Sequence, residues 1–188
     1  MKKLTVILGL VLVMCLLPLV SCAAPPAPAP VVPTPPTEPV TPGYFRNYWP
    51  KFGYGFEYPE DWAEHSPEEF TMSPGFEKVE MFTKKGEGTS ITIIVKSTDW
   101  TNLEEVKKQY GEMHPRKIVL KEGIIEVNSR EGYEIIYKSP PTKTRVVVFL
   151  ANGRAFIISY AAHHEEHKDL YAASEEIFDH VINSFVIE

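Results

Sequence analysis

The chain has 188 residues, of which 44% are hydrophobic and 23% are charged, and this suits one ordinary domain with additional segments. Its formal net charge is −6, from 19 basic and 25 acidic residues, so it lacks the basic excess that attracts nucleic acid. We therefore predict no nucleic-acid partner.

The first segment, residues 1–21, is predicted to be a signal peptide, because two lysines precede a nearly unbroken apolar run. It ends in Leu19-Val20-Ser21-Cys22, which resembles the lipobox of bacterial lipoproteins, where the cysteine thiol receives a diacylglyceryl group. We expect lipidation of Cys22, an extracytoplasmic place in the cell envelope and attachment to the membrane through lipid. A plain secretory signal and an uncleaved membrane anchor are the alternatives.

A linker is predicted at residues 22–43, which begin with the lipidated Cys22. Residues 24–42 contain nine prolines, and proline fixes φ and removes a backbone donor, so this segment favours extended polyproline II structure. At about 3.1 Å per residue it reaches roughly 60 Å when fully extended. The globular domain is therefore expected at residues 44–188.

The first half of this domain shows strand patterns. Tyr54, Phe56 and Tyr58 alternate with other residues, which predicts a strand followed by a turn that buries Trp62. Residues 79–83 and 89–96 alternate in the same way around a glycine-containing turn and predict a hairpin.

A helix is predicted next. Thr101 and Glu104 have the spacing of a capping box, and apolar residues then recur at helical intervals until Pro115.

Four further strands are expected around residues 118–127, 133–138, 144–150 and 154–161, with a tight turn at Asn152-Gly153. The last two are almost continuously apolar, which is typical of central strands covered on both faces. A helix from about residue 164 to 183 ends the domain. The expected fold class is α+β, a mostly antiparallel β-sheet flanked by helices.

Three strings of the domain carry a family resemblance. They are Gly55-Phe56-Glu57-Tyr58-Pro59-Glu60-Asp61-Trp62, Gly153-Arg154-Ala155-Phe156-Ile157-Ile158-Ser159-Tyr160 and Ile177-Phe178-Asp179-His180-Val181-Ile182-Asn183-Ser184-Phe185. These strings resemble the PsbP-like family, which has an α/β/α sandwich fold and shares it with the envelope lipoprotein DcrB. The resemblance implies a binding and assembly module, usually without catalysis. It carries over no binding residues, because the matching positions are structural.

Chemical motifs are few. His163 and His167 have a spacing that suits two metal ligands on adjacent turns of a helix, so a divalent-metal site is predicted there as a secondary possibility. Partial packing of these histidines against the sheet is the simpler interpretation. No catalytic residues and no cofactor are predicted, because the chain has no G-x-S-x-G elbow and no phosphate-binding loop.

Aromatic residues gather near the start of the domain. Tyr44, Tyr48, Trp49 and Trp62 suit a carbohydrate or peptide groove, although core packing is the expected role of Trp62.

We predict a non-enzymatic envelope lipoprotein whose domain binds a protein partner or stabilises a membrane-associated complex. A ligand-binding module for a divalent metal or small solute is the alternative, and a hydrolase is a distant one.

Overall fold

The computed structural model describes residues 40–65, 74–84, 86–113, 117–163 and 168–188, all of which belong to one compact unit. The predicted signal peptide and most of the linker lie outside this part of the chain. Neither described helix is long and apolar enough to cross a lipid bilayer.

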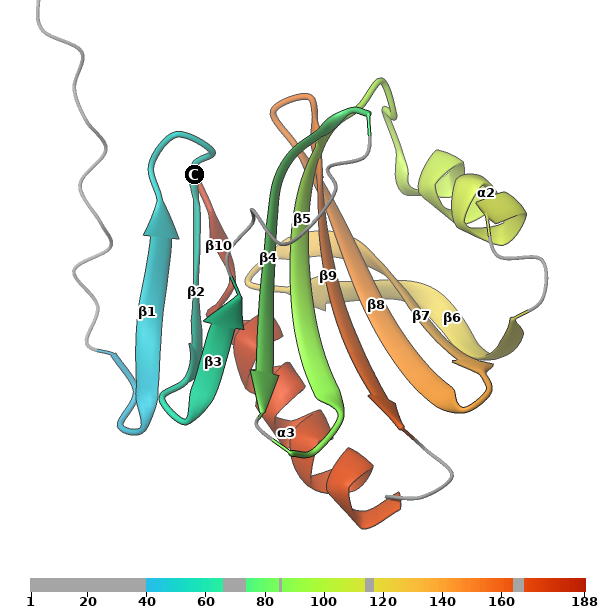
Figure 1. Ribbon diagram of the computed structural model, residues 1–188. Helices are drawn as coiled ribbons and strands as arrows, with labels where there is room; N and C mark the ends of the chain where they lie inside the picture. Colours follow the sequence, from blue (N-terminus) through green and yellow to red (C-terminus); the bar gives the residue numbers. More distant parts are fainter. Residues whose placement is uncertain (1–39, 66–73, 85, 114–116, 164–167) are drawn as a thin grey trace, which may run out of the picture. The chain divides into compact units, whose positions relative to one another are not determined.

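Two antiparallel sheets and two helices make up the described fold (Figure 1). The larger sheet has seven strands in the order β3-β4-β5-β9-β8-β7-β6. The strands run over β3 (Trp62–His65), β4 (Phe76–Lys84), β5 (Thr89–Ser97), β6 (Ile118–Val127), β7 (Arg130–Ser139), β8 (Thr142–Ala151) and β9 (Arg154–His163). The smaller sheet has the order β1-β2-β10 and consists of β1 (Tyr44–Trp49), β2 (Tyr54–Pro59) and β10 (Val186–Ile187).

The larger sheet is covered on both faces, as the apolar runs in β8 and β9 predicted. The helix α3 (Lys168–Ser184) and the smaller sheet cover one face, where Phe56, Phe156 and Phe178 are fully buried in the larger apolar cluster. The helix α2 (Leu103–Met113) covers the other face and buries Val106 there. The structure therefore has an α+β architecture of the predicted kind.

The start of α2 differs from the predicted capping box by one residue. The Asn102 side chain accepts a hydrogen bond from the Glu105 N–H at 3.0 Å, and the Glu105 carboxylate accepts one from the Thr101 N–H at 2.6 Å. Asn102 is thus the capping residue, and the acidic partner is Glu105 instead of Glu104.

A charged triad fixes α3 to the larger sheet. Arg145 of β8 contacts the buried Glu134 of β7 at 2.8 Å and Asp179 of α3 at 2.5 Å. Burial raises the pKa of Glu134, but Lys121 and Arg145 outweigh this effect, so the pKa lies below its usual value. The triad therefore orients the helix over the sheet.

Candidate functional site: a polar groove between β2 and α3

The candidate site is a surface groove with a cavity volume of about 480 Å³, which we call the β2–α3 groove. Its polar lining comes from β1 and β2, from the turn between β6 and β7, and from the end of α3. These side chains are Arg46, Tyr48, Glu57, Asn128, His180, Asn183 and Ser184. Thr41, which belongs to the predicted linker, also lines the groove. The linker therefore enters the domain at the edge of this site.

Glu57 organises the charges of the groove. Its carboxylate is 3% exposed and accepts hydrogen bonds from Arg46 Nη2 at 2.7 Å and from His180 Nε2 at 3.0 Å. Burial raises the pKa of Glu57, but hydrogen bonds from Thr41, His180 and Arg46 outweigh it and bring the pKa below its usual value. The groove thus contains a carboxylate that stays ionised and is already paired.

Two aromatic rings shape the groove. Tyr44 lies on the imidazole of His180, with ring centroids 3.9 Å apart. Tyr48 lies against Gly55 of β2, where a Cβ atom would approach the Tyr48 ring to 3.0 Å, so a larger residue there would require the ring to shift. The Tyr48 hydroxyl donates to Glu188 Oε2 at 2.7 Å, and this hydrogen bond together with burial raises its pKa to about 12.

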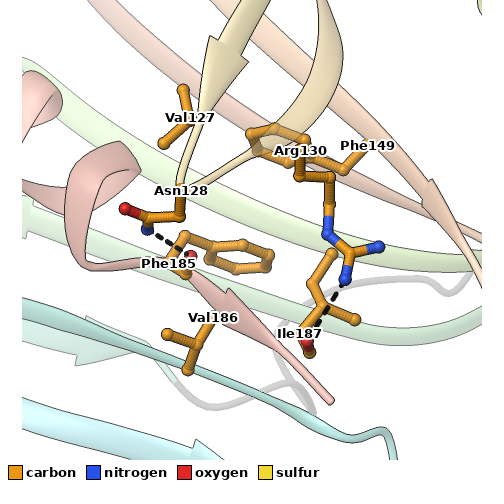
Figure 2. A pocket seen from close by; sticks show the side chains of 7 residues that line it. All are labelled: Val127, Asn128, Arg130, Phe149, Phe185, Val186 and Ile187. Atoms are coloured by element: carbon orange, nitrogen blue, oxygen red, sulfur yellow. Dashed lines mark hydrogen bonds between the residues drawn. The ribbon is translucent and has the colours of Figure 1, made fainter.

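A second, smaller pocket of about 130 Å³ adjoins the groove and shares Asn128 and Val186 with it. Figure 2 shows the Asn128 side chain reaching Phe185, just before β10, and the Arg130 side chain reaching Ile187 of β10. Asn128 Nδ2 donates to the carbonyl of Phe185 at 3.2 Å, and Arg130 Nη2 donates to the carbonyl of Ile187 at 3.3 Å. Asn128 of the turn between β6 and β7 and Arg130 at the start of β7 therefore hold the end of the chain in place and form one wall of the smaller pocket.

The groove also contains a hydroxyl group beside its charged side chains. Ser184 is the one serine among the described lining residues, and both hydrogen-bonding functions of its hydroxyl are engaged. It accepts from the Glu57 N–H at 2.9 Å and donates to the carbonyl of Val181 at 3.0 Å. The imidazole of His180 pairs with the Glu57 carboxylate through Nε2 at 3.0 Å.

Another buried carboxylate joins the two sheets. Glu80 of β4 accepts hydrogen bonds from Asn47 Nδ2 at 2.8 Å, from Trp49 Nε1 at 2.6 Å and from the Tyr54 hydroxyl. Lys78 lies over the Trp49 ring at 3.6 Å. Burial is the main influence on Glu80 and raises its pKa above the usual value.

The predicted aromatic groove is only partly formed. Tyr48 lines the β2–α3 groove and Tyr44 packs on His180 beside it. The Trp49 indole instead donates to the buried Glu80. Trp62 is buried in the core, as expected.

The predicted metal ligands are not brought together on one helix. His163 is the last residue of β9 and is therefore not on α3, so the helical spacing assumed for His163 and His167 is wrong for His163. The side chain of residue 163 and residues 164–167 lie outside the described part of the chain. Metal binding by this pair therefore stays a prediction. Among the described residues, no group of three His, Cys, Asp or Glu side chains is placed to hold a metal.

Sequence reasoning missed His180, Glu57 and Asn128 as groove residues. Glu57 and His180 lie in two of the strings that carry the family resemblance, where only a packing role is predicted. The available signal was a single carboxylate, Glu57, within an otherwise aromatic and glycine-rich strand.

Comparison with known proteins agrees with this fold. The family model of PsbP-like proteins matches residues 42–187. The solution structure of cyanobacterial PsbP from Synechocystis sp. PCC 6803 superimposes with a TM-score of 0.60 at 16% identity, covering 85% of this chain and 100% of that protein. A Pseudomonas aeruginosa protein of unknown function gives a TM-score of 0.43 at 12% identity, covering 71% of this chain and 94% of that one.

A structure from Bacteroides thetaiotaomicron gives a TM-score of 0.38 at 12% identity, covering 72% of this chain and 45% of that one. A search of curated proteins finds no match. Since the family model spans most of the chain, this chain belongs to the PsbP-like protein family.

Proposed function

We propose that this chain is a membrane-anchored, non-enzymatic binding module that holds a protein partner in the cell envelope through the β2–α3 groove. Lipid on Cys22 provides the membrane attachment, and the Pro-rich linker sets the distance between membrane and domain. The PsbP-like domain supplies the binding surface.

The groove itself carries the proposal. The side chains of Arg46, Glu57 and His180 are already held in ion pairs with one another. They therefore lose little conformational entropy when a polypeptide binds, which favours binding. Exposed Asn183 and the Tyr48 ring complete a mixed polar and aromatic surface. Such mixed surfaces suit contacts with another protein.

Binding of a small solute is the second candidate. The cavity volume of about 480 Å³ falls within the range of roughly 300–1,000 Å³ that small-molecule sites occupy.

Site-specific photo-crosslinking tests the first candidate. A photoreactive amino acid replaces Asn183 at the end of α3 in the full-length chain, which is expressed in its native envelope. A matched variant carries the same group at Glu176, which is exposed on the same helix and does not line the groove. We expect one dominant crosslinked protein from position 183, none from position 176, and loss of the product in Cys22→Ser.

Equal labelling from both positions would contradict the groove as the contact surface. If position 183 gives no product, thermal unfolding of the full-length chain with divalent metals and small solutes tests the second candidate. Saturable stabilisation that Arg46→Ala removes would then assign the groove to a solute.

A further inference from the structure

Strand β6 is an open edge of the seven-stranded sheet with an unusual number of exposed apolar side chains. Ile118 is 59% exposed, Leu120 is 48% exposed and Ile124 is 51% exposed. On its outer side β6 pairs with no strand of the described chain. The opposite edge, β3, has four residues, whereas β6 has ten. Long apolar edges readily pair with another strand.

The charges along this strand point to one kind of partner. Lys117 directly precedes β6 and Lys121 lies in its first half, whereas Glu122 lies at its centre and Glu126 in its second half. A second copy lying antiparallel would set the basic half of each strand against the acidic half of the other. A parallel alignment would set like charges side by side.

An irregularity in β6 also favours this arrangement. The pairing with β7 shifts between Val119 and Lys121, so Val119 and Leu120 together occupy one position of the ladder. Ile118 and Ile125 pair with Lys138 and Gly132, which are an even number of residues apart on β7, so both isoleucines share one face of the sheet.

The same relation identifies the apolar residues of β6 on the opposite face of the sheet. Val119 and Ile124 pair with Tyr137 and Tyr133 and therefore share the face that α2 covers. A two-fold axis at Glu122 then places Ile118 opposite Ile125, and Val119 with Leu120 opposite Ile124. The same axis places Lys117 opposite Glu126 at both ends.

We propose that two copies of this chain pair through antiparallel β6 strands around a two-fold axis at Glu122, joining their larger sheets into one continuous sheet. The two central Glu122 side chains are flanked by Lys107 of α2, which lies 3.6 Å from Glu122 within each copy. This interface is separate from the β2–α3 groove. Anchoring both copies in one membrane raises their effective concentration, which supports a small interface of this kind.

Disulfide crosslinking of the full-length chain in its native envelope tests the register. Glu122→Cys lies on the axis, so this single variant should form a covalent dimer under mild oxidation. Glu126→Cys alone and Lys117→Cys alone should form no covalent dimer. Each of these cysteines lies far from the same cysteine of the second chain. The double variant Lys117→Cys/Glu126→Cys should form the dimer again.

Absence of a dimer from Glu122→Cys, or equal dimer formation by all single variants, would overturn the proposal. A mixed disulfide between Glu122→Cys and another protein would overturn it as well. The unsubstituted chain, which retains Cys22, sets the background. Each variant is first shown to unfold in urea as the unsubstituted chain does.

A charge exchange distinguishes self-pairing from any other partner. In the Glu122→Cys background, Lys117→Glu or Glu126→Lys alone should lower the dimer fraction about tenfold, because each change places like charges together twice per dimer. The double exchange Lys117→Glu/Glu126→Lys should restore the dimer. If it lowers the fraction further, self-pairing is wrong. Crosslinking at Asn183 should be unaffected in every variant, so the two proposals fail separately.

Discussion

Glu57, Glu80 and Glu134 are all buried carboxylates, but their partners differ in charge. Glu134 contacts Lys121 and Arg145, and Glu57 contacts Arg46, so both carry cationic partners. The hydrogen-bond donors to Glu80 are neutral, and the pKa of this carboxyl is raised accordingly. The same residue type therefore has opposite effects on stability at different places in one domain.

The raised pKa of Glu80 predicts a stabilising substitution. Because the folded state binds this proton more tightly, Glu80 lowers stability as the pH rises above the ordinary value of 4.5. Glu80→Gln keeps an oxygen acceptor and removes the charge. We expect it to raise the free energy of unfolding by about 1 kcal/mol at pH 8, an advantage that disappears near pH 4. Urea denaturation at the two pH values measures the difference, and a loss of stability at pH 8 would contradict it.

Glu57 predicts the opposite behaviour. Its pKa is lowered in the folded state, so its contribution to stability is present above the ordinary value of 4.5 and is lost as the pH falls through the folded value. Glu57→Gln removes a buried negative charge from its contacts with Arg46 and His180, and it should lower the free energy of unfolding by about 3 kcal/mol at pH 7.

The matched control for Glu57→Gln is Glu60→Gln, because Glu60 is exposed just beyond the end of β2. We expect a change within about 0.5 kcal/mol for this control. Urea denaturation from pH 7 to pH 3 compares the two variants. If the loss in free energy of unfolding of Glu57→Gln is as large at pH 3 as at pH 7, the charge of Glu57 is not the cause of the loss.

The burial of Glu57 could not be predicted from residue pattern alone. Alternation of Tyr54, Phe56 and Tyr58 indicated one buried face, and Glu57 falls on the other face. The structure buries both faces of β2, because α3 lies beside this strand and His180 reaches its carboxylate. Contacts between segments so distant along the chain leave no periodic signal in β2 itself.

At the scale of elements, the turn between β6 and β7 combines a backbone role with a side-chain role. Asn128 and Ser129 have positive φ values of 51° and 61°, which Asn tolerates better than most residues. The Asn128 side chain also donates to the carbonyl of Asn183 at 2.8 Å, at the end of α3. One residue thus shapes a turn and caps a distant helix.

Two substitutions separate these roles. Asn128→Gly retains the backbone freedom and loses the hydrogen bonds, so it should lower the free energy of unfolding by about 1 kcal/mol. Asn128→Ala also strains the positive φ and should cost about 1 kcal/mol more. Urea denaturation measures both, with Ser129→Gly as the control that relieves strain. Equal losses for Gly and Ala would exclude the backbone contribution.

Long, patterned elements were predictable, and short ones were not. The hairpin of β4 and β5 and the turn at Asn152 are confirmed, because alternation and turn chemistry act locally. Strands β1, β3 and β10 were missed. β10 has two residues and forms only by pairing with β2, from the other end of the domain. The smaller sheet, and with it one side of the groove, therefore had no local signature.

At the scale of the whole molecule, the linker predicts that partner binding depends on how far the domain can extend from the membrane. Deleting residues 24–39 removes most of the predicted tether but keeps Thr41 at the groove. We expect the temperature of unfolding to stay the same while photo-crosslinking from position 183 is lost, because the domain can no longer extend roughly 60 Å from the membrane. A scrambled sequence of equal length and proline content is the control. Undiminished crosslinking after the deletion would exclude a role for reach.

The larger sheet consists of two meanders, β3-β4-β5 and β9-β8-β7-β6, which meet where β5 pairs with β9. Every other ladder in this sheet joins strands that are neighbours along the chain, whereas this one pairs Ser97 with Arg154 across α2 and three strands. Closing such a long loop costs entropy before any contact compensates for it. The two meanders are therefore expected to behave as separate foldons, and the ladder between β5 and β9 is where the domain becomes one cooperative unit.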